Sequence, residues 1–488
     1  MLAAVNSAML SGAVGCSLSV EVQVSSGLPG FTIVGLPDAA VREARDRVRA
    51  AVLSSGLSWP MRRVTVNLAP SGVRKAGAGL DLPIAVGLLV ATGDLPPDCT
   101  DDLAFCGELG LNGSLRHVPG MLALADAATA PALVVPLCDV REAALVRGAD
   151  VHGAATLSDL VSVLRRQATW PAIPEEPVPT RSVPGPDLSE VRGQIVGRRA
   201  LEVAAAGRHH LLLIGPPGSG KTMLAERLPS LLPPLTKEEA LTVSRIHSSA
   251  GAALPSAGLL ERPPFRAPHH QATIVSLVGG GNMWLRPGEA SLATHGVLFL
   301  DELGEFPVAA LEALRQPLEE GVIRVNRAGG SATFPAQFLL VAAMNPCPCG
   351  EGVFDGACSC SIVIRARYRR RISAPLLDRF DLVVPVGRPR AEDLMSDSPG
   401  EPSATVAARV VAARARAAAR GSEELPLTAD ANTSLANKLR EGALSARGLN
   451  KVKQVAQTMA DLEGTDLVTH NHVAEALSLR AGRAAVIA

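Results

Sequence analysis

The chain has 488 residues, of which 47% are hydrophobic and 19% are charged. This balance is typical of a globular protein and excludes an intrinsically disordered or collagen-like chain, and the length predicts about three domains. Lys and Arg number 47 against 47 Asp and Glu, so the net charge is zero. A protein held on nucleic acid by its overall charge is thereby disfavoured, while a local basic patch remains open.

No segment predicts a helix that spans a membrane. The apolar stretch between Asp81 and Asp94 holds 12 uncharged residues, whereas a bilayer needs roughly 20. The first 20 residues are uncharged, but they lack the basic start of a signal peptide, and polar residues such as Asn6 and Ser7 interrupt them. We therefore expect a strand there that leads into residues 20–24, and a cytoplasmic location without membrane contact.

Residues 1–165 alternate between strand-like and helix-like runs. The strand-like runs cover residues 20–24, 63–68 and 132–135, and the helix-like runs cover 39–53, 82–91 and 121–129. Such alternation predicts an α/β or α+β unit. Residues 166–186 are assigned to a linker, because residues 171–186 contain six prolines and no helical period.

A phosphate-binding loop follows the linker. The pattern G-x-x-x-x-G-K-[ST] is matched in full by Gly215, Pro216, Pro217, Gly218, Ser219, Gly220, Lys221 and Thr222. The apolar run 211–214 precedes it and the helical run 223–228 follows, which is the context that this motif requires. The backbone N–H groups would surround the phosphates, Lys221 would reach the β- and γ-phosphates, and Thr222 would ligate Mg²⁺. A chance glycine turn is the alternative.

Two further apolar strands end in polar residues. Residues 297–300 precede Asp301 and Glu302, which we expect to hold Mg²⁺ and to polarise the attacking water, respectively; an acidic surface turn is the alternative. Residues 338–344 precede Asn345, whose amide can orient that water or sense the γ-phosphate, although an Asn at a strand end often only caps a turn. Residues 187–390 are therefore predicted to form a nucleotide-hydrolysing domain.

A basic run and a candidate catalytic arginine come next. Five arginines lie within residues 365–371, and the run 375–381 contains Arg379. An arginine from a neighbouring subunit can stabilise the charge that develops during phosphoryl transfer, and Arg379 is the candidate. The basic run itself favours a solvated or salt-bridged face over direct DNA contact. Residues 391–402 are expected to be a loop, and the Ala-rich residues 403–488 a helical domain, so that 391–488 form the last unit.

Four cysteines crowd into 14 residues: Cys347, Cys349, Cys358 and Cys360. Four thiolates can surround one Zn²⁺ tetrahedrally, so a structural zinc is the preferred interpretation. The C-x-C spacing is less usual than C-x₂₋₄-C, and free thiols or a redox pair remain alternatives. His269 and His270 have no second cluster with matching spacing, and we expect them to pack or hydrogen-bond locally.

Taken together, these motifs resemble the AAA+ ATPases of the magnesium-chelatase-like clade. Three further strings are similar to the YifB/ComM family: FRAPHH at 265–270, VGGG at 278–281 with PGE at 287–289, and GLPGFTIVGLPD at 27–38. The resemblance covers nearly the whole chain. It implies an α/β P-loop ATPase core with a C-terminal helical lid, ATP and Mg²⁺ as cofactors, and a homohexameric ring with its sites between subunits.

The resemblance also assigns residues within that ring. It implies Arg379 as an arginine finger that acts on the neighbour's nucleotide and Arg447 as a lid arginine that reaches the phosphates. It implies that residues 263–290 form an insert that projects toward the central pore.

The first unit resembles the Lon protease domain. Such peptidases need a Ser nucleophile and a Lys base, but Gly79 stands where that Ser would fall, and residues 118–122 offer no Lys. Ser71 and Lys75 lie nearby and are interpreted as ordinary loop residues rather than a displaced dyad. We therefore expect a scaffold without protease activity.

The resemblance implies two kinds of substrate. Well-studied YifB/ComM members act as DNA branch-migration motors in natural transformation, so the leading hypothesis is a hexameric helicase-like motor on branched or duplex DNA. The alternative is a protein-remodelling ATPase of the chelatase type; the complete set of ATPase residues argues against an inactive ring protein. Aromatic residues make up only 3%, which favours duplex backbone contacts over base stacking. The candidate DNA contacts are Arg262, Arg266, Arg286, Arg324 and Arg327.

Overall fold

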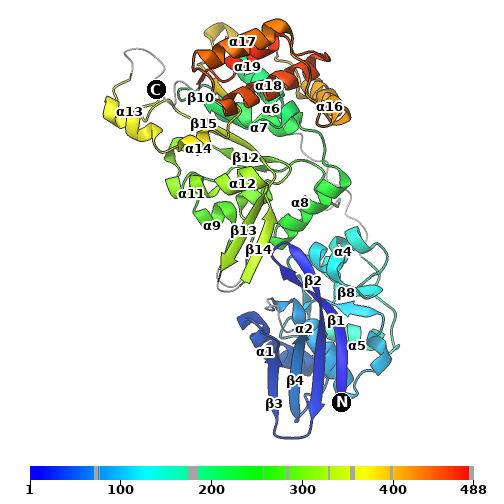
Figure 1. Cartoon of the computed structure of the whole chain (residues 1–488). Helices are drawn as coiled ribbons and strands as arrows, with labels where there is room; N and C mark the ends of the chain where they lie inside the picture. Colours follow the sequence, from blue (N-terminus) through cyan, green and yellow to red (C-terminus); the bar gives the residue numbers. More distant parts are fainter. Residues whose placement is uncertain are drawn as a thin grey trace.

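The computed structural model describes residues 1–70, 75, 77–173, 185–255, 258–281, 285–327, 330–351, 358–395 and 399–482, with the backbone alone at Ala78, Arg327 and Gly330. The molecule is elongated, and the chain runs from an N-terminal sheet through a central sheet to a group of helices at the opposite end (Figure 1). Across the described ranges, none of the helices combines the length and the apolar character that a membrane crossing requires.

A seven-stranded sheet organises the N-terminal part, with strand order β3-β4-β2-β1-β5-β8-β9. Its strands are β1 (Leu2–Ser11), β2 (Val14–Ser25), β3 (Gly30–Val34), β4 (Arg63–Ala69), β5 (Leu103–Phe105), β8 (Ala132–Pro136) and β9 (Val151–Ala154). The single strand expected near the start is instead a hairpin, in which β1 pairs antiparallel with β2. Gly12 makes this turn because its φ of 68° lies in the left-handed region, which glycine adopts without strain.

Helices pack on this sheet, and their apolar side chains form a hydrophobic core with those of its strands. They are α1 (Ala39–Ser54), α2 (Asp81–Thr92), α3 (Met121–Ala127), α4 (Val140–Arg147) and α5 (Leu157–Leu164), and a short ribbon of β6 (Glu108–Leu109) and β7 (Leu115–Arg116) lies beside them. Almost every residue of α2 is buried, and the helix packs on β1 and β2. The uncharged stretch after Asp81 is therefore the central helix of a protein core, which is hydrophobic all round for that reason.

A five-stranded parallel sheet forms the central part. Its order is β11 (Phe265–Arg266), β12 (Val297–Leu300), β15 (Leu339–Met344), β10 (Leu211–Ile214) and β16 (Leu382–Pro385). Every neighbouring pair is parallel, and β10, β12 and β15 are buried throughout, which explains their continuous apolar runs. Because β15 lies between β10 and β12, the segments that follow these three strands meet at one edge of the sheet.

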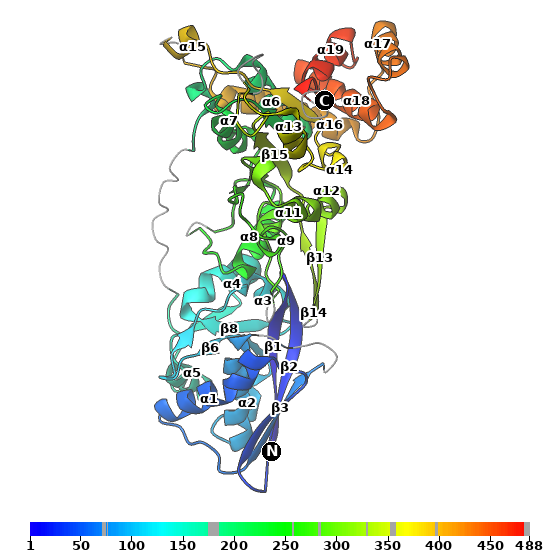
Figure 2. The ribbon, with the colours of Figure 1, turned by 90° about the vertical axis from the view of Figure 1, so that its left-hand side faces the viewer.

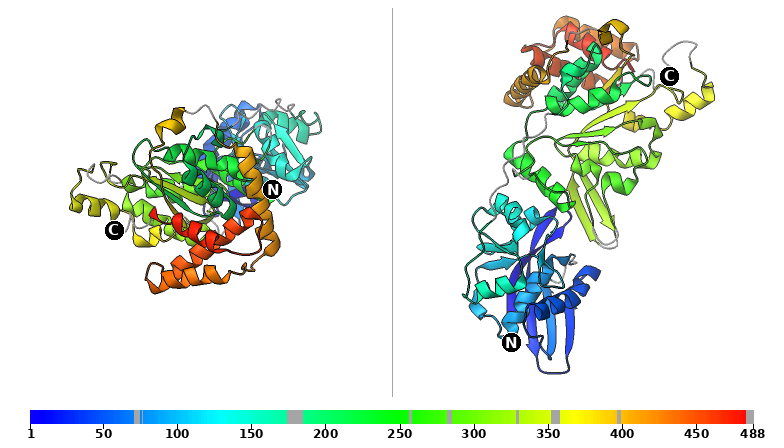
Figure 3. Two further views of the ribbon diagram at one scale, coloured as in Figure 1. Left: turned by 90° about the horizontal axis from the view of Figure 1, so that it is seen from above. Right: turned by 180° about the vertical axis from the view of Figure 1, so that it is seen from behind.

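Helices and one hairpin surround this sheet (Figure 3). They are α6 (Ile195–Gly207), α7 (Lys221–Arg227), α8 (Lys237–Ser249), α9 (Ile274–Val278), α10 (Glu289–Leu292), α11 (Val308–Ala313), α12 (Arg315–Glu320), the antiparallel pair β13 (Val322–Arg327) and β14 (Gly330–Pro335), α13 (Ile362–Arg369) and α14 (Ala374–Leu377). The β13–β14 hairpin extends from the central part toward the N-terminal sheet (Figure 1).

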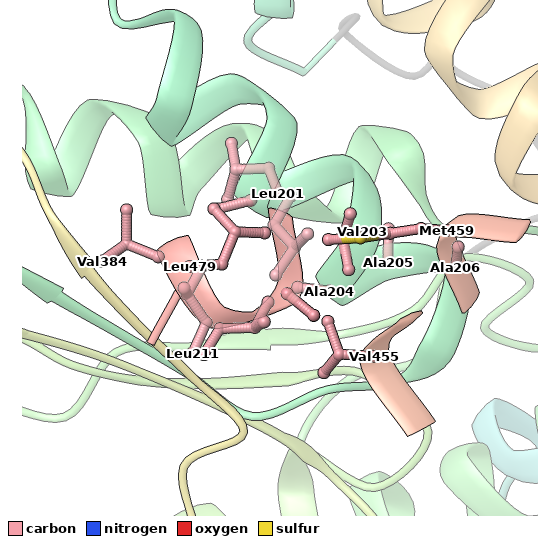
Figure 4. Packing of buried hydrophobic residues seen from close by; sticks show 14 of the residues in the cluster. Leu201, Val203, Ala204, Ala205, Ala206, Leu211, Val384, Val455, Met459 and Leu479 are labelled. Carbon is pink, nitrogen blue, oxygen red and sulfur yellow. The ribbon is translucent and has the colours of Figure 1, made fainter. Parts of the chain in front are cut away.

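The last part is helical. It contains α15 (Ala391–Met395), α16 (Ser403–Arg420), α17 (Ala429–Arg440), α18 (Ala446–Glu463) and α19 (His470–Ser478). Val455 and Met459 of α18 pack beside Ala204 of α6 in one buried cluster (Figure 4). Residues 391–402 were expected to be a loop, but α15 occupies their first five positions. Its first turn carries Glu392 and Asp393, which favour a helix N-terminus electrostatically.

Among the described residues, the N-terminal part contacts the central part at the tip of the β1–β2 hairpin and along α8 (Figure 2). At the tip of the β1–β2 hairpin, Ala13 is 3% exposed and shares a buried cluster with Phe334 of β14. Beside it, α3 packs against α8, and Arg245 of α8 forms an ion pair with Asp126 at 2.9 Å.

Candidate nucleotide-binding site

The phosphate-binding loop connects β10 to α7. Gly218 and Gly220 have φ values of 75° and 85°, which a residue with a side chain rarely adopts. A Cβ on Gly215 would lie 2.0 Å from the carbonyl oxygen of Val386, so this glycine lets the loop lie directly against the end of β16. The sequence motif therefore forms the tight loop that cradles phosphates at the start of α7.

Lys221 lies inside this loop with 8% of its surface exposed. Its Nζ donates hydrogen bonds to the carbonyl oxygens of Gly215 (2.8 Å) and Pro216 (2.9 Å) and to Oδ1 of Asn345 (3.3 Å). Burial lowers the pKa of Lys221. Among the described residues the ammonium thus has neutral acceptors and no carboxylate at hydrogen-bond distance, and a phosphate would be a stronger partner than any of them.

Thr222 and Asp301 come together across the sheet edge. The Thr222 hydroxyl donates to Oδ2 of Asp301 at 2.7 Å, and the backbone N–H of Glu302 donates to Oδ1 of Asp301 at 2.9 Å. A hydroxyl and a carboxylate are hard oxygen ligands of the kind that Mg²⁺ prefers. The donor set at this position therefore fits a magnesium ion bound beside the phosphates.

Glu302 has a partner that the sequence did not reveal. Its backbone has a φ of 51°, and an oxygen of its half-exposed carboxylate lies at hydrogen-bond distance from Nδ1 of His270, 2.9 Å away. The ring of His269 lies against that of His270, with centroids 4.1 Å apart. Local hydrogen bonding was expected for these histidines, but not to the candidate catalytic carboxylate. One feature of the sequence could have indicated this contact. His270 follows β11 closely, and β11 is the neighbour of β12, the strand that precedes Glu302.

Arg379 and Arg447 lie on the other flank of the central part. Arg379 follows α14 and forms an ion pair with Glu319 of α12, and Arg447 lies at the start of α18. Figure 2 shows α14 and α18 on the side opposite to α7. Burial lowers the pKa of Arg379, and the positive charges of Arg447 and Arg315 lower it further. The two predicted arginines are thus brought near each other, away from the phosphate-binding loop of the same chain.

A buried carboxylate ties α18 to the segment that carries Arg379. Oδ1 of Asp381 lies 2.6 Å from Nζ of Lys451, which also donates to the carbonyl of Arg379 at 2.8 Å. Burial by itself would raise the pKa of Asp381, but His209 and Lys451 hold that pKa far below its usual range. His210 is a structural residue, since burial lowers its pKa to about 4 and its Nδ1 accepts from the Leu340 N–H at 3.0 Å.

The four clustered cysteines converge. Their sulfur atoms all lie within 4.8 Å of one another, and Sγ of Cys347 is 3.1 Å from Cys349 and 3.6 Å from Cys358. Tetrahedral zinc with Zn–S bonds of about 2.3 Å places its sulfurs roughly 3.8 Å apart, so the cluster fits the ion. A hydrogen bond from the Glu351 backbone lowers the pKa of Cys349 to about 6, which favours the thiolate.

The loop that carries Cys347 and Cys349 packs against the phosphate-binding loop. Gly350 has a φ of 84°, and a Cβ there would lie 2.6 Å from Cδ of Pro217. The loop also begins two residues after Asn345, which contacts Lys221. Whatever fixes the cysteine loop therefore also supports one wall of the phosphate site.

Within the insert of residues 263–290, Gly280 and Arg286 close a loop. The backbones of Gly280 and Arg286 exchange two hydrogen bonds of 3.0 Å. A Cβ on Gly279 would lie 2.6 Å from the carbonyl oxygen of Arg286, so glycine is needed for the two legs to approach. Residues 282–284 of the insert lie outside the described residues.

The five arginines proposed as DNA contacts differ in their environments. Arg266 forms a two-point ion pair with Glu289 at 2.6 and 2.9 Å, and Arg324 pairs with Glu320. Arg262 and Arg286 are exposed, and the side chain of Arg327 lies outside the described residues. Arg266 is thus engaged within the insert, and the exposed pair retains the properties of a phosphate contact.

In the N-terminal part, Lys75 is fully buried and donates to the carbonyl of Pro70. Burial lowers the pKa of this lysine. Ser71, its suggested partner, lies outside the described residues. Gly79, which stands in place of the protease nucleophile, faces Val118, whose Cγ1 would be 3.0 Å from an added Cβ.

Sequence comparisons give a consistent result. Residues 187–394 match the family described as magnesium chelatase, subunit ChlI; residues 20–137 match subunit ChlI of Mg-chelatase, and residues 400–480 match the ChlI C-terminal family. The chain is 43% identical over 483 residues to the uncharacterized protein YifB of Escherichia coli, and 41% identical over 485 residues to the competence protein ComM of Haemophilus influenzae. Each alignment covers 95% of this chain and 94% of the relative.

A more distant similarity covers about a third of the chain. The chain is 28% identical over 178 residues to the probable DNA helicase MCM9 of Arabidopsis thaliana, an alignment that spans 36% of this chain and 22% of that protein.

Proposed function

Because this chain belongs to the YifB/ComM family of magnesium-chelatase-like AAA+ ATPases, we propose that it is a ring-forming motor that uses ATP hydrolysis to move DNA. The ATPase itself follows from family membership. The observation that carries the proposal is the meeting of three loops at one sheet edge, where Thr222 bonds Asp301 at 2.7 Å and Lys221 reaches Asn345 at 3.3 Å.

In the proposed mechanism, each side chain has one task. The loop N–H groups and Lys221 bind the β- and γ-phosphates, and Lys221 exchanges its carbonyl partners for phosphate oxygens. Thr222 and Asp301 would hold Mg²⁺, which neutralises charge on the phosphates. Asn345 positions the attacking water, and Glu302 polarises it once its carboxylate leaves His270.

A neighbouring subunit completes the site in this proposal. Arg379 and Arg447 lie near each other on the flank opposite to α7. In a ring of like subunits, each copy would present this flank to the phosphates of the next copy. The transferred phosphoryl group spreads charge over its oxygens, and an arginine supplied from outside stabilises that charge. We infer a homohexamer on the basis of the family resemblance.

DNA is the proposed substrate, and branch migration during natural transformation the proposed role. One relative is a probable DNA helicase by name and another a competence protein, and both support a DNA substrate for this chain. The exposed Arg262 precedes the insert and the exposed Arg286 lies within it, and both can contact phosphates without reading sequence. The ChlI family match supports the second candidate, the remodelling of a protein partner.

We also propose that Cys347, Cys349, Cys358 and Cys360 bind a structural zinc. The convergence of the four sulfurs supports it. A bound ion would cross-link residues on both sides of the intervening loop and so fix Gly350 against Pro217.

The test measures ATP turnover and junction migration by the full chain, with a synthetic four-way DNA junction. We expect hexamers with ATP, turnover stimulated by DNA alone, salt-sensitive junction binding and strand products without sequence preference. Arg262→Ala with Arg286→Ala should weaken binding, while Arg440→Ala, on the exposed surface of α17, should not. An ATP-assembled hexamer that does not bind DNA at low salt refutes the DNA motor and favours the protein-remodelling alternative.

A further inference from the structure

Three arginines gather on the flank that carries Arg379. Arg315 is the first residue of α12, Arg379 follows α14, and Arg447 lies at the start of α18. The positive charges of Arg447 and Arg315 both act on the Arg379 guanidinium. Three separate elements thus bring like charges together, which costs free energy unless an anion joins them.

The anions present within the chain satisfy these arginines incompletely. Arg379 pairs with Glu319, and Arg315 pairs with Glu312 at 2.9 Å. Among the described residues, the Nε atoms of Arg315 and Arg379 are buried and have no hydrogen-bond acceptor. A buried donor without an acceptor is unfavourable, so both guanidinium groups are stabilised if they turn toward a further acceptor.

The two carboxylates differ in how many groups hold them, and this difference decides which of them an incoming anion can displace. Glu312 is held from a second side by the hydroxyl of Ser373, the residue that caps α14. Glu319 is half-exposed, and within the described ranges its side chain pairs with Arg379 alone. Glu312 is therefore a fixed support for Arg315, whereas Glu319 is a replaceable counter-ion for Arg379.

We propose that Arg315 is a third arginine of the intersubunit site, which together with Arg379 and Arg447 receives the triphosphate of the neighbouring copy, and that Glu319 occupies Arg379 until that triphosphate displaces it. This inference rests on the proposed function of Arg379 in the neighbour's site. Guanidinium groups bind phosphate oxygens through two parallel N–H donors, so a triphosphate supplies the acceptors that both Nε–H groups lack. Arg315 then stabilises the negative charge on the leaving or transferred phosphate. Glu319 sets the ATP concentration at which two copies associate.

The first experiment mixes variants of the full chain. Lys221→Ala removes the phosphate-binding lysine but leaves the arginine flank intact, so rings that combine it with Arg315→Ala contain some complete sites. We expect Arg315→Ala alone to lower turnover at least about tenfold, since one donor to charge developing in a transition state is worth roughly 10²–10³. Mixing with Lys221→Ala should restore part of that turnover, and Arg315→Lys should retain more activity than Arg315→Ala.

Arg379→Ala is mixed with Lys221→Ala in parallel. This comparison tests the role of Arg315 separately from the existence of an intersubunit site. Rescue of Arg379→Ala but not of Arg315→Ala, in rings shown to be mixed, overturns the assignment of Arg315 and leaves the proposed function intact. No rescue of either variant overturns the intersubunit site itself. Arg440→Ala is the matched control and should turn over ATP at the wild-type rate.

The second experiment tests Glu319 through assembly alone. Hexamer formation is followed by light scattering against the concentration of AMP-PNP, an ATP analogue that is not hydrolysed. Glu319→Gln should lower the half-maximal concentration about threefold or more, because Arg379 no longer has to leave a carboxylate. Glu320→Gln, its neighbour paired with Arg324, should not change it. An unchanged or raised half-maximal concentration for Glu319→Gln, with melting temperature equal to wild type, overturns the role of Glu319.

Discussion

Single side chains at the sheet edge divide binding from hydrolysis. Lys221 is buried among neutral acceptors, whereas Glu302 is half-exposed and paired with a histidine from another segment. Lys221 is thus placed to bind a negatively charged phosphate, whereas Glu302 can be released from its histidine partner. Substitutions at the two positions should have different consequences.

Lys221→Ala should abolish tight ATP binding, since it removes the cation that faces the phosphates. Glu302→Gln should bind ATP normally and lose turnover by several orders of magnitude, since an amide does not polarise water. Fluorescent-nucleotide titration and phosphate release measure the two properties. Normal hydrolysis by Glu302→Gln would show that another residue activates the water.

His270→Ala should raise the ATP turnover measured without DNA by about two- to fivefold, because a half-exposed hydrogen bond contributes roughly 0.5–1 kcal/mol and its loss frees Glu302. His269→Ala is the matched control, since the ring of His269 lies against that of His270 but, among the described residues, makes no contact of its own with the Glu302 carboxylate. Equal basal rates in wild type and His270→Ala would mean that the pair does not restrain the carboxylate.

The sequence predicts the candidate-site residues that belong to contiguous motifs, but not the contacts that residues from distant segments make with them. Lys221, Thr222, Asp301 and Asn345 follow apolar strands, and parallel pairing forces such strand ends together. His270 lies in the string FRAPHH and Glu319 lies outside the motifs described, and the partners of both are decided by how a short helix or insert packs. Pairings of that kind depend on tertiary packing, which one sequence does not encode in its spacing.

At the scale of elements, α18 connects the lid to the catalytic flank. Its residues Lys451 and Thr458 bond Asp381 and His209, while Val455 and Met459 pack on α6. The helix was predictable from its 3.6-residue period and Ala-rich composition, as were β10, β12 and α1 within a residue or two. The α15 helix and the β1–β2 turn were not, because they depend on a few local residues rather than on a period.

Asp381→Asn should lower the free energy of unfolding at pH 7 by roughly 3–5 kcal/mol, because it leaves Lys451 buried without its counter-ion. The pKa of Asp381 is lower in the folded chain than its ordinary value of about 3.9. Its stabilisation is therefore fully present above that value and is lost as pH falls further below it. Urea unfolding from pH 7 to pH 3 should thus show the difference from wild type narrowing only at the acid end. The exposed Asp466→Asn is the control, and a constant difference at every pH would contradict the ionic origin.

The cysteine loop offers a test of metal binding. Cys347→Ser with Cys349→Ser should lose about one zinc per subunit and raise the KM for ATP, because Gly350 no longer braces Pro217. Cys138→Ser, an exposed cysteine in the N-terminal part, should change neither quantity. Elemental analysis that finds no zinc in reduced, carefully purified wild type would end the zinc proposal.

The whole molecule joins a seven-stranded N-terminal sheet to the ATPase part through the β1–β2 tip and the α3–α8 contact. From the burial of Ala13 against β14 we expect the two parts to unfold cooperatively rather than separately. This contact was beyond sequence reasoning, since residues 11–14 show only that polar and small residues interrupt an apolar run.

Ala13→Asp should disrupt that contact, because a carboxylate buried without a partner costs several kcal/mol. Calorimetry should then resolve two thermal transitions where wild type has one, with the N-terminal part still folded. Val14→Asp is the matched control, since Val14 is 59% exposed in the next position. A single unshifted transition in Ala13→Asp would show that the tip contributes nothing to the coupling.

Attachment at two places has a mechanical consequence. A body fixed at one point can pivot in any direction, whereas a body fixed at two points can only rock about the line that joins them. The N-terminal part is attached at its hairpin tip and, through α3 and α4, along α8, so a displacement of β13–β14 or α8 would rock it about the line that joins these two contacts. The edge strand β3 would then travel farther than the elements that drive it.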